Sequence, residues 1–379
     1  MSDFPQAEFE ARLEKAQAAM QAQDLDALFF TTEPEIRYFT GFRTLFWQSP
    51  TRPWFLVIPA KGEPVAVIPE IGAALMASTW IEDIRTWSSP HPDDDGISLV
   101  YGALSQVKRI GMPMGRESSL RMPLADFERL RSTLAGAEFV DATPLVRKLR
   151  MVKSEAEIKK IAAICDIASR AFEQAPTRFH EGQRLDEAFR AFKIELLSEG
   201  AEDVPYLVGG AGNPGYGDVI SPPDPQPLRR GDVLMLDTGA CREGYFCDFD
   251  RNFAIGTAHD RSKAAHRTLF AATEAGLDAA RPGATCTDVF AAMARVMEEA
   301  GYGGGDVGRL GHGLGMQLTE APSLTAFDAT DLEAGIVLTL EPSLEIAPGA
   351  IMVHEENIVV RDGPPQLLTT RAPAELPVI

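Results

Sequence analysis

The chain has 379 residues, of which 45% are apolar and 24% charged, and its formal net charge is −19. This is an ordinary globular composition, long enough for two or three domains. The negative charge argues against a nucleic-acid or anionic-membrane partner, because both attract basic surfaces. The sequence shows neither the roughly 18–20-residue apolar run of a membrane span nor the apolar core of a signal peptide, so we expect a cytoplasmic protein.

Strand and helix patterns alternate through the first 150 residues. Apolar residues recur at helical spacing over 6–23 and predict a helix there. Short apolar segments bounded by turn residues predict the strands, and a second periodic segment predicts another helix. The predicted strands are 26–32, 54–60, 63–70 and 109–114, and the second helix covers 124–134. This alternation predicts an α/β domain over residues 1–150.

A different pattern begins just after residue 150. Ser154 and Glu157 have the spacing of a capping box, in which each side chain bonds the other residue's backbone N–H at a helix start. The remaining predicted helices are 185–199, 261–280 and 285–301, and the remaining predicted strands are 232–240, 245–255, 335–341 and 350–360. We therefore predict a mixed α+β domain over residues 151–379, and α+β as the class of the whole chain.

The segment GAGNPG (210–215) fits the G-x-G-x-x-G pattern of dinucleotide-binding folds. In those folds the last glycine opens a helix that faces the pyrophosphate. Here the following YGDVISPPDPQP contains four prolines, which are incompatible with a helix. We predict a flexible glycine loop, one that covers a pocket, and no nucleotide site.

Four cysteines occur without C-x-x-C spacing and are too few for a disulfide scaffold. We expect reduced thiols. Cys247, next to Asp248, has two interpretations: a soft metal ligand, or a small buried strand residue, and the second is the more common role.

Two acids stand in an otherwise apolar hairpin. Asp237 and Asp248 flank a turn that contains Gly244, and strands disfavour Asp. If the two carboxylates lie near each other on one face, they repel and neither ionises freely. A bound cation removes the repulsion, and hard divalent ions prefer oxygen ligands.

Further acids and a histidine follow in apolar or glycine-rich surroundings. His312 lies between glycines, Glu341 ends an apolar strand before a proline, and the alternating stretch 352–360 carries Glu355 on one face and Glu356 on the other. Taken singly, each has an ordinary interpretation as a turn former, a structural histidine or a salt-bridge partner. As a set they have the composition of a two-metal site, in which carboxylates hold ions roughly 3.5–4 Å apart.

This order of residues resembles metallopeptidase family M24, which includes methionine aminopeptidase, Xaa-Pro aminopeptidase, prolidase and the metal-free creatinase. The match covers 151–379 and implies the pita-bread fold, while 1–150 resembles the creatinase/prolidase N-terminal domain. The resemblance implies a homodimer and two divalent ions, Mn, Co or Zn. It implies the metal ligands Asp237, Asp248, His312, Glu341 and Glu356, with Asp248 and Glu356 at the bridging positions. Glu341 would also act as general base toward a bridging hydroxide, which attacks an amide carbonyl.

The sequence departs from the family pattern at several positions. Peptide-cleaving relatives carry a histidine where this chain has Thr319, and another near Ile220, and these histidines position the peptide and its oxyanion. Thr319 is therefore a candidate substrate contact. His354 replaces an arginine of many relatives; we consider it either a catalytic acid/base or oxyanion group, or a residue that hydrogen-bonds a carboxylate.

Asp250 stands where relatives usually have threonine. We consider it an extra ligand or an anchor for a cationic substrate, or else the partner of a nearby arginine, Arg251 or Arg229. Phe46 and Trp47 lie in an aromatic, proline-rich segment. They would contact substrate if the N-terminal domain reached a partner's active site, as in dimers of this family, or would serve only loop packing.

The sequence thus predicts a metal-dependent hydrolase of a small amide or peptide, Xaa-Pro aminopeptidase- or dipeptidase-like. A non-peptide C–N hydrolase or lyase on the same fold, creatinase-like or ectoine-hydrolase-like, is the first alternative, since both histidines are absent. A catalytically inactive binding homologue is the second, which retention of all five ligands disfavours.

Overall fold

The computed structural model describes residues 4–49, 51–302 and 308–379. Its residues group into two compact units, Met1–Arg150 and Met151–Ile379. None of the helices in the described ranges combines the length and the apolar character that crossing a membrane requires.

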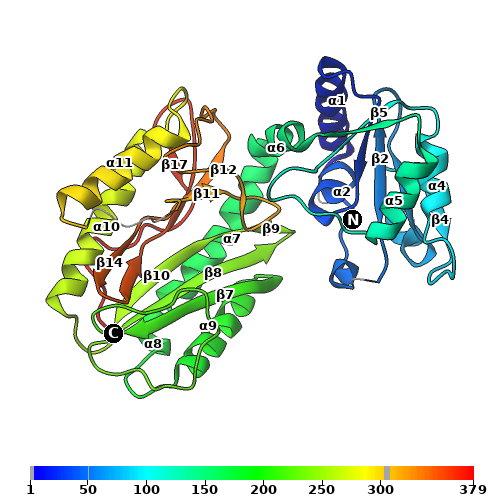
Figure 1. The fold of residues 1–379 in the computed structure, drawn as a ribbon. Coiled ribbons are helices and arrows are strands. Elements are labelled where there is room, and N and C mark those ends of the chain that lie inside the picture. The colour runs from blue at the N-terminus through cyan, green and yellow to red at the C-terminus, as the bar shows by residue number, and fades with distance from the viewer. Residues whose placement is uncertain (1–3, 50, 303–307) are drawn as a thin grey trace. The chain divides into compact units, whose positions relative to one another are not determined.

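The first unit is built on a six-stranded sheet in the order β4-β3-β2-β1-β5-β6 (Figure 1). Strand β1 pairs antiparallel with β2 and parallel with β5, so the sheet is mixed. The strands are β1 Ala27–Phe30, β2 Phe55–Pro59, β3 Val65–Pro69, β4 Asp83–Trp87, β5 Arg109–Met112 and β6 Glu138–Asp141. Residues Phe29, Phe55 and Ile110 of this sheet belong to one apolar core with residues of two helices, α4 (Ile97–Leu104) and α5 (Leu124–Thr133).

Helices surround this sheet. Helices α4 and α5 cover one face, and α1 and α2 lie on the other (Figure 1). The helices of the first unit are α1 Gln6–Ala22, α2 Glu33–Thr40, α3 Ala73–Met76, α4 Ile97–Leu104, α5 Leu124–Thr133 and α6 Thr143–Met151, with short 3-10 turns η1 Leu45–Gln48 and η2 Glu70–Gly72. Layers of helices on a mixed sheet make this unit an α/β domain.

The second unit has two main sheets. One has the order β10-β8-β7, with β9 also pairing β8, and the other β12-β11-β13-β16-β17. Strands β14 and β15 form a separate hairpin. The strands are β7 Asp203–Gly212, β8 Val233–Arg242, β9 Tyr245–Phe246, β10 Phe249–Ala254, β11 His312–Gly313, β12 Glu320–Ser323, β13 Val337–Leu340, β14 Ser343–Ala347, β15 Ala350–Val353, β16 Glu356–Val359 and β17 Gln366–Leu367.

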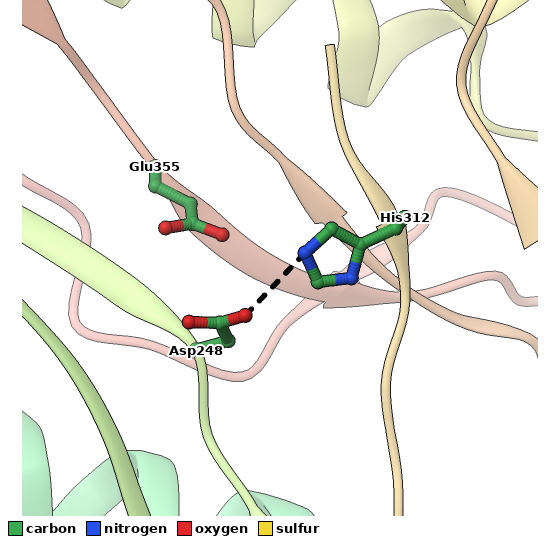
Figure 2. A group of neighbouring side chains, drawn as sticks. All are labelled: Asp248, His312 and Glu355. Carbon is green, nitrogen blue, oxygen red and sulfur yellow. Dashed lines mark ion pairs between the residues drawn. The ribbon is translucent and has the colours of Figure 1, made fainter. Parts of the chain in front are cut away.

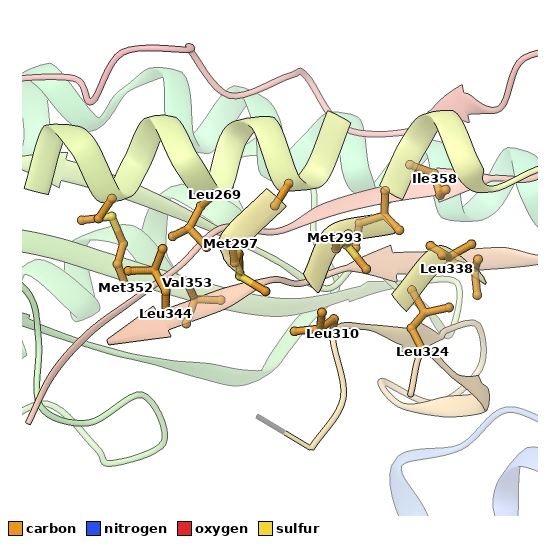
Figure 3. Packing of buried hydrophobic residues seen from close by; sticks show 14 of the residues in the cluster. Leu269, Met293, Met297, Leu310, Leu324, Leu338, Leu344, Met352, Val353 and Ile358 are labelled. Carbon is orange, nitrogen blue, oxygen red and sulfur yellow. The ribbon is translucent and has the colours of Figure 1, made fainter. Parts of the chain in front are cut away.

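Five helices accompany these sheets: α7 Glu155–Glu173, α8 Ala175–Arg178, α9 Leu185–Glu199, α10 Asp260–Ala279 and α11 Cys286–Glu299. Helix α7 begins at the predicted capping box, with both Ser154–Glu157 bonds formed. Helices α10 and α11 lie side by side (Figure 1) and bury apolar side chains against the strands. Figure 3 shows Leu269 and Met293 of these helices in one cluster with Leu338, Met352 and Ile358 of the strands.

The glycine segment 210–215 differs from the predicted loop. Gly210 and Gly212 belong to β7 and pair with Met235 and Val233 of β8. Glycine is required in this strand because a Cβ at Gly212 would lie 2.4 Å from the carbonyl oxygen of Gly215. The prediction of a loop was wrong at Gly210 and Gly212. Glycine occupies these positions because the backbone packs closely there, and not because the segment is mobile. The chain does not enter a helix after them, as expected.

Candidate metal centre

The hairpin brings two acids to one place. Asp237 of β8 opposes Asp250 of β10 in the strand register, and Asp248 lies one residue before β10. Burial raises the pKa of Asp237 and of Asp248, and the negative charge of Asp248 raises that of Asp237 further. Asp248 is held by Asn357, whose Oδ1 accepts from the Asp248 N–H at 3.0 Å and whose Nδ2 donates to the Asp248 carbonyl. Asp248 is therefore buried and held through its backbone, and Asp237 lies near enough for the two charges to interact.

His312 of β11 lies next to Asp248. Its flanking glycines permit close packing, since a Cβ at Gly311 would lie 2.2 Å from the Thr339 carbonyl oxygen and one at Gly313 would lie 2.3 Å from that of Ala321. Nδ1 of His312 lies 2.8 Å from the Gly313 carbonyl oxygen, which only accepts, so Nδ1 carries the proton. The lone pair of Nε2 then faces Asp248 Oδ2 at 3.4 Å. This is the tautomer that a metal-binding histidine requires.

Two glutamates complete the group. The register that pairs Leu340 with Glu356 continues in the next hairpin, where Ser343 pairs with Val353. Glu341 and Glu355 therefore lie opposite each other between the two ladders. Glu341 Oε2 is 4.0 Å from His312 Nε2. One ligand atom each from Asp248, His312 and Glu355 lie within 4.8 Å of one another, as their side chains converge in Figure 2.

The prediction of Glu356 as a metal ligand was wrong. Its carboxylate is fully buried, and among the described residues the group of possible ligands around Asp248 and His312 contains Glu355 in its place. It accepts hydrogen bonds from four partners: Arg251 Nη2 at 2.9 Å, Arg371 Nη1 at 3.0 Å, the Ala372 N–H at 2.9 Å and the Thr369 hydroxyl. Burial alone would raise the pKa of Glu356, but these partners lower it. Because side chains alternate along an extended segment, the face that holds Glu356 cannot also hold Glu355.

The catalytic role of His354 stays a prediction, although its surroundings are those of a packed residue. His354 shares a face with Glu356 and lies among Thr273, His266 and Phe270 of α10. Its Nδ1 is 3.1 Å from the Thr273 hydroxyl oxygen, so its hydrogen bond goes to a helix and not to a carboxylate. Burial, with a smaller effect of Arg371, lowers the pKa of His354.

The remaining predicted positions are distributed differently. Asp250 is buried, and its Oδ2 accepts from Asn252 Nδ2 at 2.7 Å. Thr319 is exposed, as is Ile220. Phe46 is half-buried and Trp47 buried, and both pack on Trp54 within the first unit. Substrate contact by Asp250, Thr319, Phe46 or Trp47 stays a prediction.

Three residues of the site were missed from the sequence as functional groups. The alternation placed Glu355 and Glu356 on opposite faces of the strand, but the sequence could not show which face lines the metal centre. Tyr206 of β7 favours the charged form of the Asp237 carboxylate, and burial together with nearby acids raises the pKa of Tyr206. Asn357 holds Asp248 from a strand 109 residues away. A polar residue alternating with the acids, such as Asn357 two positions after Glu355, was the available signal.

The residues present fit a bound cation. Asp237 Oδ1, Asp250 Oδ1 and Glu355 Oε1 are buried without a hydrogen-bond partner among the described residues. Burial raises the pKa of Glu355, and the charge of Asp248 adds to this. Buried carboxylate oxygens of this kind are costly unless something positive is bound. Oxygen ligands with one imidazole suit divalent ions such as manganese or zinc.

This fold and this ligand set together define a metal-dependent hydrolase. The comparison with known families agrees: residues 159–362 match the model of metallopeptidase family M24, and residues 12–152 match the creatinase/prolidase N-terminal domain. The chain belongs to metallopeptidase family M24. The predicted family, the α+β class and the pita-bread architecture are confirmed. Use of divalent metal follows from the family.

Individual relatives match along nearly the whole chain. The Xaa-Pro dipeptidase of Pyrococcus horikoshii is 25% identical over 93% of this chain and 95% of its own. The crystal structure of dipeptidase PepE from Mycobacterium ulcerans is 29% identical, covers 99% of both chains and superposes with a TM-score of 0.86. The Xaa-Pro dipeptidase from Bacillus anthracis, 22% identical with 98% of this chain and 100% of its own covered, shares the fold with a TM-score of 0.86.

Proposed function

We propose that this enzyme is a cytoplasmic, homodimeric Xaa-Pro dipeptidase that uses two divalent cations. Asp237, Asp248, His312, Glu341 and Glu355 would hold the ions, with Glu355 in the place that the sequence had given to Glu356. The observation that supports the proposal is the convergence of Asp248, His312 and Glu355, with Glu341 4.0 Å from His312 and with buried, unpartnered oxygens on Asp237 and Glu355 among the described residues. The dipeptide substrate is supported by the relatives named Xaa-Pro dipeptidase.

Each part of the reaction has a residue suited to it. When bound, such cations supply Lewis-acid polarisation of a carbonyl and lower the pKa of water. The Glu341 side chain is 32% exposed, and burial raises its pKa. Glu341 Oε2 can therefore take a proton from the attacking water and return it to the proline nitrogen that leaves. Asp248 keeps its orientation through Asn357.

Proline release from Xaa-Pro dipeptides tests the proposal. Metal-stripped enzyme is assayed with manganese, cobalt or zinc added back, on Ala-Pro, Ala-Pro-Ala and Ala-Ala. We expect metal-dependent release from Ala-Pro and little from the tripeptide or from Ala-Ala. Preference for the tripeptide would make the enzyme an aminopeptidase.

The metal content of the same samples distinguishes the ways in which the assay can fail. If two metals bind and no peptide is cleaved, the peptide substrate is wrong and the site acts on a non-peptide amide. If the protein binds no metal, the ligand assignment itself is wrong.

A further inference from the structure

A buried ion pair lies next to the strand that carries His312. Lys153 Nζ is 3.2 Å from Glu320 Oε2, and the two side chains are only 2% and 7% exposed. Glu320 belongs to β12, which pairs with β11. A buried ion pair adds little net stability compared with apolar residues of the same size, because both charges lose their hydration. Stability alone therefore does not account for this pair.

The Glu320 side of the pair fixes the turn between β11 and β12. In the strand register Glu320 is the partner of Gly313, the residue that follows the histidine of the metal centre. Glu320 Oε1 accepts the backbone N–H of Gln317 at 3.0 Å, which closes the turn. The turn also lies tightly on the pair, since a Cβ at Gly315 would lie 3.0 Å from Lys153 Cε and 3.1 Å from Glu320 Oε2. A change in the ion pair would therefore move the backbone that leads away from β11.

The same turn contacts the hairpin that carries Asp248. The N–H of Phe246 donates to the Gly315 carbonyl at 2.9 Å, and Phe246 is two residues before Asp248. The preceding residue, Tyr245, donates its hydroxyl proton to Glu157 Oε1 at 3.0 Å, and both residues are buried. Glu157 belongs to the first turn of α7. The start of α7 thus holds the hairpin just before Asp248.

The start of α7 therefore contacts two segments that lead to the metal centre. Through Lys153 it holds the segment after His312, and through Glu157 it holds the segment before Asp248. The Lys153 backbone is itself fixed, because its N–H donates to the Gly335 carbonyl at 3.0 Å. His312 Nε2 and Asp248 Oδ2 are 3.4 Å apart (Figure 2). A cation that binds both needs them at a defined separation, since metal–ligand distances vary by only about 0.2 Å.

We propose that Lys153 is a positioning residue of the metal centre, because its ion pair with Glu320 sets the separation of His312 from Asp248. The inference rests on the metal centre proposed above and adds to it a residue that acts through the backbone and not as a ligand. Without the ion pair, the turn after His312 relaxes and the centre holds a cation less tightly.

Charge and position predict different effects, so they can be separated. Lys153→Met removes a positive charge, and attraction alone would then make a cation bind more tightly. Glu320→Gln removes a negative charge, and attraction alone would weaken binding. If the pair acts by position, both variants should bind cobalt(II) about tenfold more weakly, the lower end of the loss for groups that support a metal ligand. Competition with a chelator on the full chain measures the affinity.

The double variant, Lys153→Met with Glu320→Gln, keeps the net charge and leaves neither charge buried without its partner, so it decides even if a single variant does not fold. We expect about tenfold weaker cobalt(II) binding, as in the single variants. We also expect altered visible absorption bands of the bound cobalt(II), which report the arrangement of its ligands.

Arg150→Met is the matched control. It breaks another buried ion pair, with Glu35 in the first unit, in which both side chains are 9% exposed. This variant should unfold at a lower urea concentration and bind cobalt(II) as the unmodified chain does. An equal loss of affinity in Arg150→Met would mean that general destabilisation, and not position, explains the effect.

Two further results would overturn the proposal. Single variants that change the affinity in opposite directions would show that only charge matters. A double variant with unchanged affinity and spectrum would show that the ion pair does not position His312. If the unmodified chain binds no cobalt(II), the metal centre itself is wrong, and the positioning role falls with it.

Discussion

Glu355 and Glu356 are neighbours in the chain and are almost equally buried, at 2% and 0% exposed, yet the two sides of their strand segment differ in charge balance. On the side of Glu356, two arginines, a backbone N–H and a hydroxyl satisfy the carboxylate. On the side of Glu355, the neighbours are other acids, and burial raises its pKa. A compensated buried acid serves the fold, whereas an uncompensated group of acids indicates a ligand site.

Exchanging each glutamate for glutamine tests this comparison most directly. Glu355→Gln should abolish tight metal binding and reduce turnover more than about 100-fold, beyond the usual loss for a residue that only supports a ligand. Glu356→Gln should retain its metal and lose mainly stability. Metal content by elemental analysis and kcat/KM on Ala-Pro are the measurements. The reverse pattern, with metal lost only in Glu356→Gln, would restore the original assignment.

Removing an arginine tests the compensated side. Arg251→Met leaves Glu356 with one guanidinium partner in a fully buried place, and breaking such a pair costs about 3–5 kcal/mol of unfolding free energy. Urea denaturation measures this loss. Arg184→Met, at an exposed pair with Asp186, is the control and should change stability by no more than about 0.5 kcal/mol. A loss no larger in Arg251→Met than in this control would show that Glu356 does not need its charge partner.

A smaller effect on metal binding is expected from Asn357, which holds the backbone of Asp248. Asn357→Leu removes both bonds to the backbone of Asp248, and losing such support lowers metal affinity by about 10–100-fold. Competition with a metal chelator measures the affinity. Cys165→Ala is the matched control, because Cys165 Sγ donates to Asn357 Oδ1, at 3.3 Å, and not to Asp248. We expect its metal affinity to be unchanged, and an equal decrease in both variants would mean that general packing explains the effect.

Local patterns in the sequence were enough for the long helices. The capping box at Ser154 and the spacing of the long helices follow from neighbouring residues, and those helices appear close to their predicted bounds. The stretch 350–360 was predicted as one strand, but it is two, β15 and β16, which pair with different partners. That division depends on contacts with β13 and β14, which local periodicity does not contain.

The same limit applies to the site. Asp237, Asp248, His312 and Glu341 were chosen because acids and a glycine-flanked histidine are unusual in apolar segments, and the structure brings them together. The alternation of 352–360 separated Glu355 from Glu356 correctly. It could not show which face meets Asp248 and which meets Arg251, because that is decided by residues about 100 positions away in the chain.

Two identical side chains in succession also create an ambiguity for folding. A shift of one residue in the pairing of β16 with β13 could put Glu356 in the place of Glu355, so that a carboxylate would still face the metal centre. The same shift would turn the apolar Ile358 out of its core cluster and move Asn357 away from Asp248. The contacts of Ile358 and Asn357 thus lower the free energy of the native register relative to the shifted one. The two acids alone would not provide this energy gap.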